Sequence, residues 1–312
     1  MKKVIYDRYG GVDVLTLVDV PVPTTDKDSL LIRVKAVSIN PLDWKIREGD
    51  LKILTGFSFP KSVGLDFSGI VEEVGASVQD FKKGDEVLGI TDIFSGNALA
   101  EYVVVKPETI THKPATISFE EAAALPIVGS SAIQIFDKLA PLQAGMDVLI
   151  IGATGGIGTN AVQIAKRRGA HVTAVVGSKS VDLAHQLGSD VVVNYDQQDV
   201  FKSSAQYDVV VDLSGKTPYS QAESSMKPES VYVTTIPSPI ETVSSFVHDI
   251  FSKKKREVLS LKASRAYLDQ LSDLATNGLI IPISQTHSIT AVQQAYAEAA
   301  KGGVLGKAVI TL

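Results

Sequence analysis

The sequence contains no cysteine among its 312 residues. A disulfide framework, a thiolate metal site and a cysteine nucleophile are therefore excluded. No apolar run approaches the ~20 residues that cross a membrane as a helix. The N-terminus lacks the long apolar segment and the small-residue cleavage site of a signal peptide. We therefore expect a cytoplasmic protein that does not bind a membrane.

The chain also lacks an excess of positive charge, with 30 Lys and Arg residues against 35 Asp and Glu residues and a formal net charge of −5. This balance argues against a nucleic-acid partner. The one basic run, Lys253 to Arg256, is interpreted as a solvated face, with a local RNA or anion site as the alternative. A hydrophobic content of 45% in a chain of this length allows two domains of ordinary size.

The stretch D-V-L-I-I-G-A-T-G-G-I-G, residues 147–158, predicts a phosphate-binding turn. Its first apolar residues read as a strand buried in a parallel sheet, and an apolar stripe after the glycines predicts a helix. In such a turn, backbone N–H groups and the positive end of the helix dipole face the anion. The residues expected to contact a dinucleotide here are Ala153, Thr154, Gly155, Gly156, Ile157 and Gly158.

The glycine pattern matches the dinucleotide fingerprint G-x-G-x-x-G imperfectly, because Ala153 stands in place of the first glycine. A lone glycine motif is weak support, since such turns also join strands to helices without a ligand. A second strand predicted over 171–176 arrives after one helix, as a βαβ unit requires. This context favours cofactor binding.

The first ~120 residues read mostly as short strands separated by turn clusters, with one helical signal over 41–48. The expected strands are 4–6, 14–18, 30–39, 67–74, 86–90 and 98–105. Their spacing predicts a closed or sandwich-like β unit.

The pattern changes at Ser118, which with Glu121 forms a predicted capping box that opens a helical stretch to about Lys138. Strands that alternate with helices follow at 147–151, 171–176, 190–194, 207–212, 231–235 and 257–262. They predict an α/β fold with a doubly wound parallel sheet. Helices near 265–276 and 291–300 and a strand over 307–312 are expected to pack back on the first domain. The predicted domains are therefore 1–121 with 264–312, and 122–263.

Seven motifs together resemble the medium-chain dehydrogenase/reductase superfamily, in its zinc-free NADPH quinone oxidoreductase branch. They are V-S-I-N-P-L-D-W-K-I-R-E-G (37–49), V-G-L-D-F-S-G-I-V-E-E-V-G (63–75), F-K-K-G-D-E-V-L-G (81–89), A-A-A-L-P-I-V-G-S-S-A (122–132), the glycine turn, Y-D-V-V-V-D (207–212) and the terminal G-K-A-V-I-T-L. The resemblance covers nearly the whole chain. It implies a GroES-like β domain and a Rossmann NADP-binding domain, with cofactor and substrate in the cleft between them. It also implies a homodimer paired through strand 257–262.

Zinc alcohol dehydrogenases of the same superfamily bind a catalytic metal through cysteine and histidine. At the positions that look equivalent, this chain has Asn40, Leu65 and Ile127, and the cysteine-rich loop of the structural zinc is missing. Leucine and isoleucine cannot bind zinc, and the five histidines lack ligand spacing, so we expect no metal. Without a Lewis acid, alcohol oxidation is disfavoured and reduction of an activated, conjugated acceptor is favoured.

The end of the second Rossmann strand indicates which cofactor is used. NAD-specific proteins carry Asp or Glu there to bind the ribose 2′-hydroxyl. This chain has Gly177, Ser178 and Lys179, which favour the 2′-phosphate of NADPH, unless Lys179 is an ordinary surface residue. By resemblance, Tyr195 packs on that phosphate. We also assign Ser214 to the cofactor site.

We predict hydride transfer from NADPH to a small-molecule quinone or α,β-unsaturated carbonyl. Asn40 is the first candidate to orient the substrate or a water, because its amide can donate to a developing oxyanion. The alternative is a turn residue before Pro41. Asp43 relays a proton or orients a neighbour, or it caps the helix that starts there. Ser131 stands where the family has a small hydroxyl residue near the nicotinamide.

The predicted apolar walls for a flat acceptor are Trp44, Leu65, Phe94 and Ile127, for which core packing is an equal alternative. Two other functions are alternatives for this sequence. Enoyl-thioester reductases of the mitochondrial type carry a proton-donor tyrosine just after the 37–49 motif, where this chain has Gly-Asp-Leu. A non-catalytic NADPH-binding sensor or structural protein is disfavoured by the pair of Asn40 and Asp43 beside a complete cofactor site.

Overall fold

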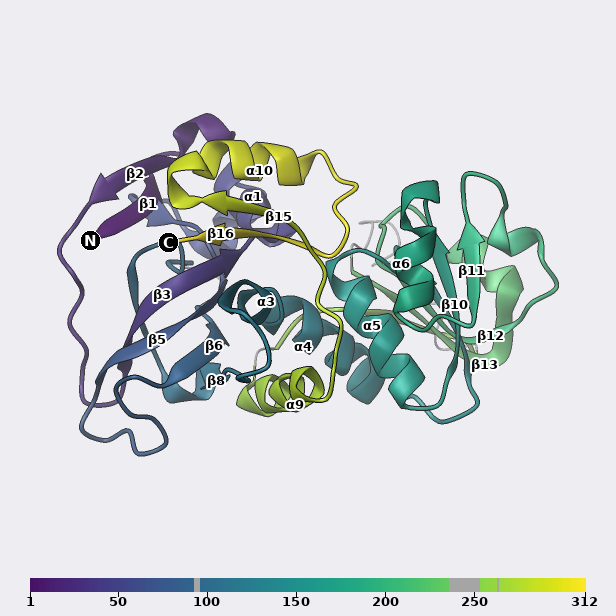
Figure 1. Ribbon diagram of the computed structural model, residues 1–312. Helices are drawn as coiled ribbons and strands as arrows, with labels where there is room; N and C mark the ends of the chain where they lie inside the picture. Colours follow the sequence, from purple (N-terminus) through teal and green to yellow (C-terminus); the bar gives the residue numbers. More distant parts are fainter. Residues whose placement is uncertain (93–95, 236–252, 263) are drawn as a thin grey trace. The chain divides into compact units, whose positions relative to one another are not determined.

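The computed structural model describes residues 1–92, 96–235, 253–262 and 264–312. The chain divides into two compact units (Figure 1). Unit 1 comprises Met1–Ser130 and Ala263–Leu312, and unit 2 comprises Ser131–Lys262. The first unit is therefore discontinuous, and its first segment ends later than the residue 121 expected from the sequence.

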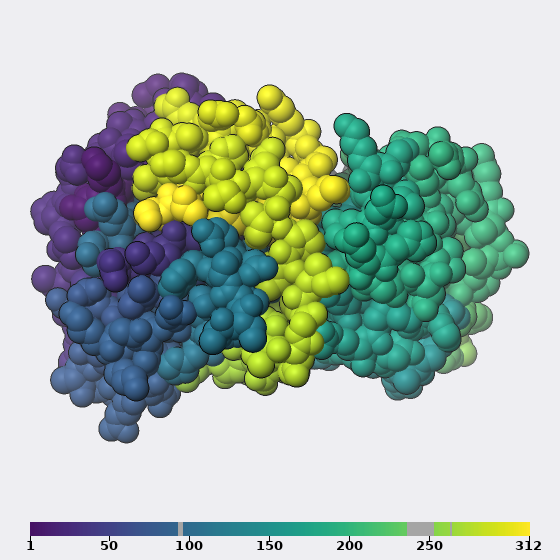
Figure 2. All heavy atoms as spheres, viewed as in Figure 1, coloured from purple at the N-terminus to yellow at the C-terminus, as the bar shows by residue number. Residues whose placement is uncertain are grey.

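Unit 1 is built on a seven-stranded sheet with the order β15-β16-β3-β5-β6-β8, in which β7 also pairs with β3. The strands are β3 (Leu30–Ser38), β5 (Asp66–Val74), β6 (Glu86–Ile90), β7 (Tyr102–Val105), β8 (Ile110–His112), β15 (Ile283–Ser288) and β16 (Lys307–Thr311). The terminal strand β16 pairs antiparallel with β3, so the end of the chain completes the N-terminal sheet. Figure 2 shows these C-terminal residues, in yellow, packed against N-terminal residues in purple and blue.

A smaller sheet with the order β2-β1-β4 adds to unit 1. It comprises β1 (Lys2–Tyr6), β2 (Thr16–Asp19) and β4 (Lys61–Ser62). The helices are α1 (Pro41–Glu48), α2 (Lys52–Thr55), α3 (Phe119–Ala123), α9 (Arg265–Thr276) and α10 (Val292–Ala300). The predicted capping box of α3 is confirmed, because Ser118 N–H donates to Glu121 and Glu121 N–H donates to Ser118 Oγ.

The expected helical stretch up to residue 138 is divided in two. α3 ends at Ala123, and α4 (Pro126–Gln134) starts at the proline, which has no N–H to continue a preceding helix. A turn of π-helix, Ile135–Leu139, follows α4. Ser130 closes the first segment of unit 1, so α4 runs from one unit into the other.

Unit 2 contains a six-stranded, wholly parallel sheet with the order β11-β10-β9-β12-β13-β14 (Figure 1). Its strands are β9 (Asp147–Ile151), β10 (His171–Val176), β11 (Val191–Asn194), β12 (Tyr207–Asp212), β13 (Met226–Thr234) and β14 (Lys255–Val258). Its other helices are α5 (Gly156–Arg167), α6 (Val181–Gln186) and α7 (Tyr219–Ala222). The strand order reverses between β9 and β12, which is where Rossmann folds bind ligands. The predicted Rossmann class is confirmed.

The sixth strand lies earlier than the sequence predicted, at 255–258 instead of 257–262. Lys255 and Arg256 pair in register with Val231 and Tyr232 of β13. The basic run therefore enters the edge strand, and the Arg256 guanidinium lies 3.6 Å from the centre of the Tyr219 ring. Stacking on this aromatic face explains why part of the run does not form the solvated loop expected from its composition.

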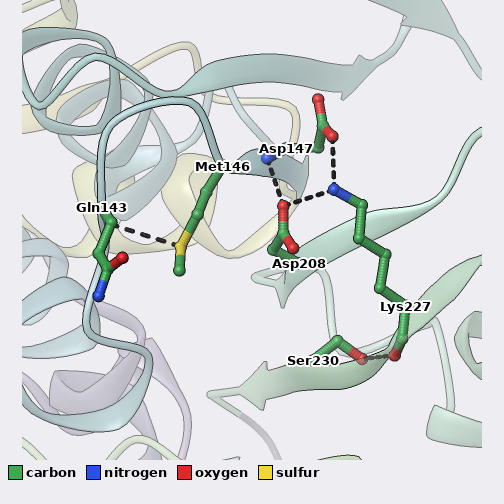
Figure 3. Close-up of polar contacts among 6 residues, drawn as sticks. All are labelled: Gln143, Met146, Asp147, Asp208, Lys227 and Ser230. Atoms are coloured by element: carbon green, nitrogen blue, oxygen red, sulfur yellow. Dashed lines mark hydrogen bonds and ion pairs between the residues drawn. The ribbon is translucent and has the colours of Figure 1, made fainter.

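The amino ends of the central strands are joined by one lysine (Figure 3). Lys227 Nζ lies 2.7 Å from Asp147 Oδ2 and 2.7 Å from Asp208 Oδ2. The Asp147 N–H also donates to Asp208 at 2.8 Å. These contacts hold the amino ends of β9, β12 and β13 together, and the candidate site lies at the opposite, carboxyl ends of the strands.

Within the described ranges, no helix has both the length and the apolar character needed to span a membrane.

Candidate active site

The glycine turn joins β9 to α5 and differs in one respect from the sequence prediction. Gly152 has a φ of +79°, a left-handed conformation that favours glycine. The tight-turn role of the first fingerprint glycine, which the sequence placed at position 153, therefore belongs to Gly152. Ala153 is buried and needs no such conformation.

Gly158 is required for close packing of α5 on the turn. A Cβ at this position would lie 2.3 Å from Gly152 O and 2.6 Å from the carbonyl carbon of Ala153. Gly155 is the N-cap of α5 in an extended conformation, and its own N–H donates to Gly152 O at 3.1 Å. The first N–H groups of a helix lack intrahelical acceptors, so those of Gly156 and its successors are suited to a phosphate.

The end of β12 lies beside this turn, as the assignment of Ser214 requires. A Cβ at Gly152 would be 3.5 Å from Ser214 N. The N–H and the hydroxyl of Ser214 both donate to Asp212 Oδ1, at 2.9 and 2.6 Å. Asp212 is buried and shapes the loop at the switch point. Sequence reasoning missed its role, although it is the acid that directly follows the apolar run 209–211 at the carboxyl end of the strand.

The residues predicted to select NADPH come together at the ends of β10 and β11. A Cβ at Gly177 would lie 2.7 Å from the Tyr195 hydroxyl, so this ring covers the glycine. Ser178 donates to Asp196 Oδ2 through its N–H at 3.0 Å and its Oγ at 2.6 Å. These hydrogen bonds lower the pKa of Asp196. Lys179 is exposed. Asp196 was not predicted, because the rule for acids concerns the second strand and this residue follows the third.

A buried carboxylate organises the candidate substrate site in unit 1. Asp66, at the start of β5, accepts hydrogen bonds from Ser38 Oγ at 2.9 Å, Asn40 Nδ2 at 3.1 Å and Ile127 N at 3.0 Å. Leu65 precedes it in the chain. The three positions that the resemblance equates with zinc ligands therefore meet around Asp66. The feature of the sequence that could have pointed to Asp66 is an aspartate within the apolar first part of the motif 63–75.

Asn40 is fixed on every side. Lys307 Nζ donates to Asn40 Oδ1 at 2.6 Å and to Ile39 O at 2.7 Å. The Asn40 N–H donates to Asp43 Oδ2 at 2.8 Å, which closes the amino end of α1. Asn40 is only 2% exposed, and its Nδ2 is directed to Asp66. A role for this amide in orienting a substrate stays a prediction.

Three buried ionisable groups, Asp43, Asp66 and Lys307, are linked through Asn40 and have shifted pKa values. Burial raises the pKa of Asp43 to about 7 and that of Asp66 to about 6, while hydrogen bonds and Lys307 act in the opposite direction. Burial lowers the pKa of Lys307. The Tyr296 hydroxyl donates to Asp43 Oδ2 at 3.2 Å. The other oxygen of Asp43 is buried without a hydrogen-bond partner among the described residues. This site can hold a proton near neutral pH.

The remaining predicted residues divide between the units. Trp44 is half-buried in α1 and packs against the core of unit 1, while Leu65 and Ile127 are buried. Ser131 is buried in the part of α4 that belongs to unit 2. Phe94 lies outside the described residues. Among the residues that the structure describes, no three histidine, aspartate or glutamate side chains form a potential metal site.

Comparisons with known proteins agree with this architecture. Residues 26–115 match the family model for the alcohol dehydrogenase GroES-like domain, and residues 156–277 match that for zinc-binding dehydrogenases. The chain is 33% identical to the chloroplastic quinone-oxidoreductase QR1 of Triphysaria versicolor, over 99% of this chain and 98% of the relative. It is 34% identical to the chloroplastic NADPH-dependent alkenal/one oxidoreductase of Arabidopsis thaliana, over 69% of this chain and 58% of the relative.

Among solved structures, the quinone oxidoreductase from Coxiella burnetii superposes with a TM-score of 0.92 at 31% identity, covering 100% of this chain and 99% of that one. The match covers both units of the chain. A mitochondrial NAD(P)H oxidoreductase of Bos taurus is 31% identical over 99% of this chain and 88% of the relative, which supports a nicotinamide cofactor. The chain therefore belongs to the medium-chain dehydrogenase/reductase superfamily and is an oxidoreductase of its quinone oxidoreductase branch.

Proposed function

We propose that this enzyme uses NADPH to reduce a quinone or an α,β-unsaturated carbonyl, without zinc. The observation that carries the proposal is the group of residues around Asp66. The positions equated with zinc ligands hold one amide, Asn40, and two hydrocarbon side chains, Leu65 and Ile127. Neither hydrocarbon has a donor atom for a metal. An acceptor that conjugation already activates needs no Lewis acid. The names of QR1 and of the alkenal/one oxidoreductase support this substrate class.

The residues of this chain are proposed to bind, orient and supply protons. When bound, NADPH supplies the hydride. The turn 152–158 would hold its diphosphate, and Gly177, Ser178, Lys179 and Tyr195 would hold its 2′-phosphate. In unit 1, Asp43 is the proposed proton relay, since a pKa of about 7 suits proton exchange at neutral pH. Ser131 is proposed to lie near the nicotinamide.

The test is an acceptor panel. NADPH oxidation is followed by the absorbance of the nicotinamide, with 9,10-phenanthrenequinone, other quinones and enones, before and after treatment with EDTA. Turnover with at least one acceptor and an unchanged rate after chelation are expected. Loss of activity on chelation, restored by zinc, would contradict the zinc-free reaction. Lys179→Glu should raise the KM for NADPH more than that for NADH, because it places a carboxylate near the 2′-phosphate.

The alternative expected from the sequence, a non-catalytic NADPH-binding protein, is put to the same test, because every polar group of Asn40 is engaged inside the protein. The same panel separates the two functions. Tight NADPH binding, measured by calorimetry, without oxidation by any quinone or enone would favour the sensor. An enoyl-thioester substrate is included as a further acceptor, and turnover with it would revise the substrate class.

A homodimer and a cytoplasmic location also belong to this proposal. The strand proposed to pair is β14, which lies at the edge of the six-stranded sheet. Light scattering of the protein as it elutes from a size-exclusion column should give twice the mass of one chain. Val258→Pro should lower the measured mass to that of one chain, because proline has no N–H to donate to a paired strand.

The cytoplasmic location is tested by cell fractionation, and recovery of the protein with an organelle would contradict it.

A further inference from the structure

The loop that follows β11 places an anion at the site proposed for the 2′-phosphate. One carboxylate oxygen, Asp196 Oδ2, accepts both the N–H and the hydroxyl of Ser178. Asn194 joins the two: its Nδ2 donates to Ser178 Oγ at 3.0 Å, and its Oδ1 accepts the Asp196 N–H at 3.0 Å. The ends of β10 and β11 are thus linked through a carboxylate.

Ser178 offers the donors that an incoming phosphate would need. It follows Gly177, the position at which NAD-specific Rossmann proteins carry their acid. Phosphate oxygens prefer backbone N–H and hydroxyl donors, and both of these groups on Ser178 are already bound to Asp196. The hydrogen bonds from Ser178 also lower the pKa of Asp196, so it is an anion at neutral pH.

The nearby positive charge does not neutralise this carboxylate. Lys179 is the adjacent cation in the chain, and in the described part of the protein it is not among the residues that contact Asp196. A phosphate monoester brings nearly two further negative charges at neutral pH. A 2′-phosphate must therefore displace Asp196 from Ser178 or bind beside it against repulsion.

We propose that Asp196 is a specificity-determining residue, whose carboxylate competes with the 2′-phosphate of NADPH for the N–H and hydroxyl of Ser178. The competition lowers the preference of the enzyme for NADPH over NADH. NADH avoids this competition, because its ribose 2′-hydroxyl is neutral and is able to donate a hydrogen bond to a carboxylate. The inference rests on the proposed use of a nicotinamide cofactor at this site and deepens it.

The test compares Asp196→Asn with Asp182→Asn. The first variant keeps an oxygen that accepts from Ser178 and removes only the charge. The second removes the same charge from an exposed residue on α6, in the segment that follows Lys179. Dissociation constants for NADPH, NADH, 2′,5′-ADP and 5′-AMP are measured by calorimetry, so the readout does not depend on turnover. kcat/KM with both nucleotides follows if an acceptor is found.

For Asp196→Asn we expect the affinities for NADPH and 2′,5′-ADP to rise about fivefold, the size of one exposed charge interaction. The affinities for NADH and 5′-AMP should stay within about twofold, and Asp182→Asn should change all four by less than that. Asp196→Ser should reproduce the gain, which guards against an effect of one variant on folding.

An unchanged ratio of NADPH to NADH in both Asp196 variants would overturn the inference, as would an equal gain in Asp182→Asn. These outcomes differ from failure of the proposed function. If neither nucleotide binds the unaltered protein, the cofactor assignment itself is wrong. If both bind and only the ratio fails to respond, the cofactor site stands and Asp196 has no role in selecting between them.

Discussion

Asp43→Asn should remove much of the pH dependence of the stability of unit 1. The pKa of Asp43 is raised from 3.8 to about 7 in the folded protein, because the carboxyl is buried. Between these values the unfolded chain ionises and the folded chain keeps its proton. Unfolding therefore releases a proton, and the free energy of unfolding falls as the pH rises. This fall in the free energy of unfolding has not begun below pH 4 and is complete above pH 7.

The size of this change in the free energy of unfolding follows from the linkage between protonation and folding. One pKa unit corresponds to about 1.4 kcal/mol, so a shift of about three units implies ~4 kcal/mol in total. Between pH 5 and pH 8 this single group should remove roughly 2.5 kcal/mol from the free energy of unfolding. Asp66, whose pKa is raised to about 6, acts in the same direction and remains in the variant. Asparagine keeps an oxygen for the N–H of Asn40 and the hydroxyl of Tyr296.

The assay uses the single tryptophan of the chain, Trp44, which follows Asp43 in α1 and reports on unit 1 alone. Urea unfolding is followed by its fluorescence at pH 5 and pH 8. The fall in stability between these pH values should be about 2.5 kcal/mol smaller in Asp43→Asn than in the unaltered protein. Asp50→Asn, an exposed acid just past α1, should leave the fall unchanged. Equal pH dependence in the unaltered protein and Asp43→Asn would refute the reasoning.

Four further substitutions test the fold. Gly158→Ala should destabilise unit 2 by several kcal/mol and abolish NADPH binding, because the added Cβ would overlap backbone atoms. Gly155→Ala is the control: its Cβ would have no contact closer than 3.5 Å, so thermal melts should show that the fold is preserved. Lys307→Met should cost about 3–5 kcal/mol in urea unfolding, since it removes two buried hydrogen bonds and the positive charge that stabilises the ionised forms of Asp43 and Asp66. Lys227→Met should cost only ~1 kcal/mol, because this lysine is one-third exposed; equal losses for the two lysines would contradict the role of burial.

The parallel sheet could be predicted closely from the sequence. β9, β10 and β12 begin and end where their apolar, β-branched runs predicted, and α1 and α9 match as well. Buried parallel strands are continuous apolar runs, so local composition identifies them. β15 was missed because its residues, I-S-Q-T-H-S, include a single large apolar side chain. Its pairing partner β16 lies about 20 residues further along the chain, and that pairing defines it.

The acids of the site were harder to predict. The turn 152–158, Gly177 and Ser178 could be proposed as site residues from residue type and spacing, and they stay predictions. The sequence could not identify Asp66, Asp196 or Asp212, because each acts through neighbours that only the fold supplies. The position of an isolated aspartate in the sequence does not indicate which residues will contact it in the fold. Asp43 was noted as both relay and cap, and the structure shows it accepting the N–H at the amino end of α1.

Burial explains why the same side chain is suited to opposite tasks in the two units. Asp196 lies in solvent, where hydrogen bonds from Ser178 stabilise the charged form and lower its pKa. Asp43 receives comparable hydrogen bonds, but the desolvation of its charge outweighs them and raises its pKa to about 7. A permanent anion can discriminate between cofactors that differ in charge, and it cannot exchange protons at neutral pH. A carboxyl poised near pH 7 can exchange protons, and its charge is too variable to select a phosphate. Under the two proposals, an exposed acid of unit 2 takes part in cofactor selection and a buried acid of unit 1 handles protons.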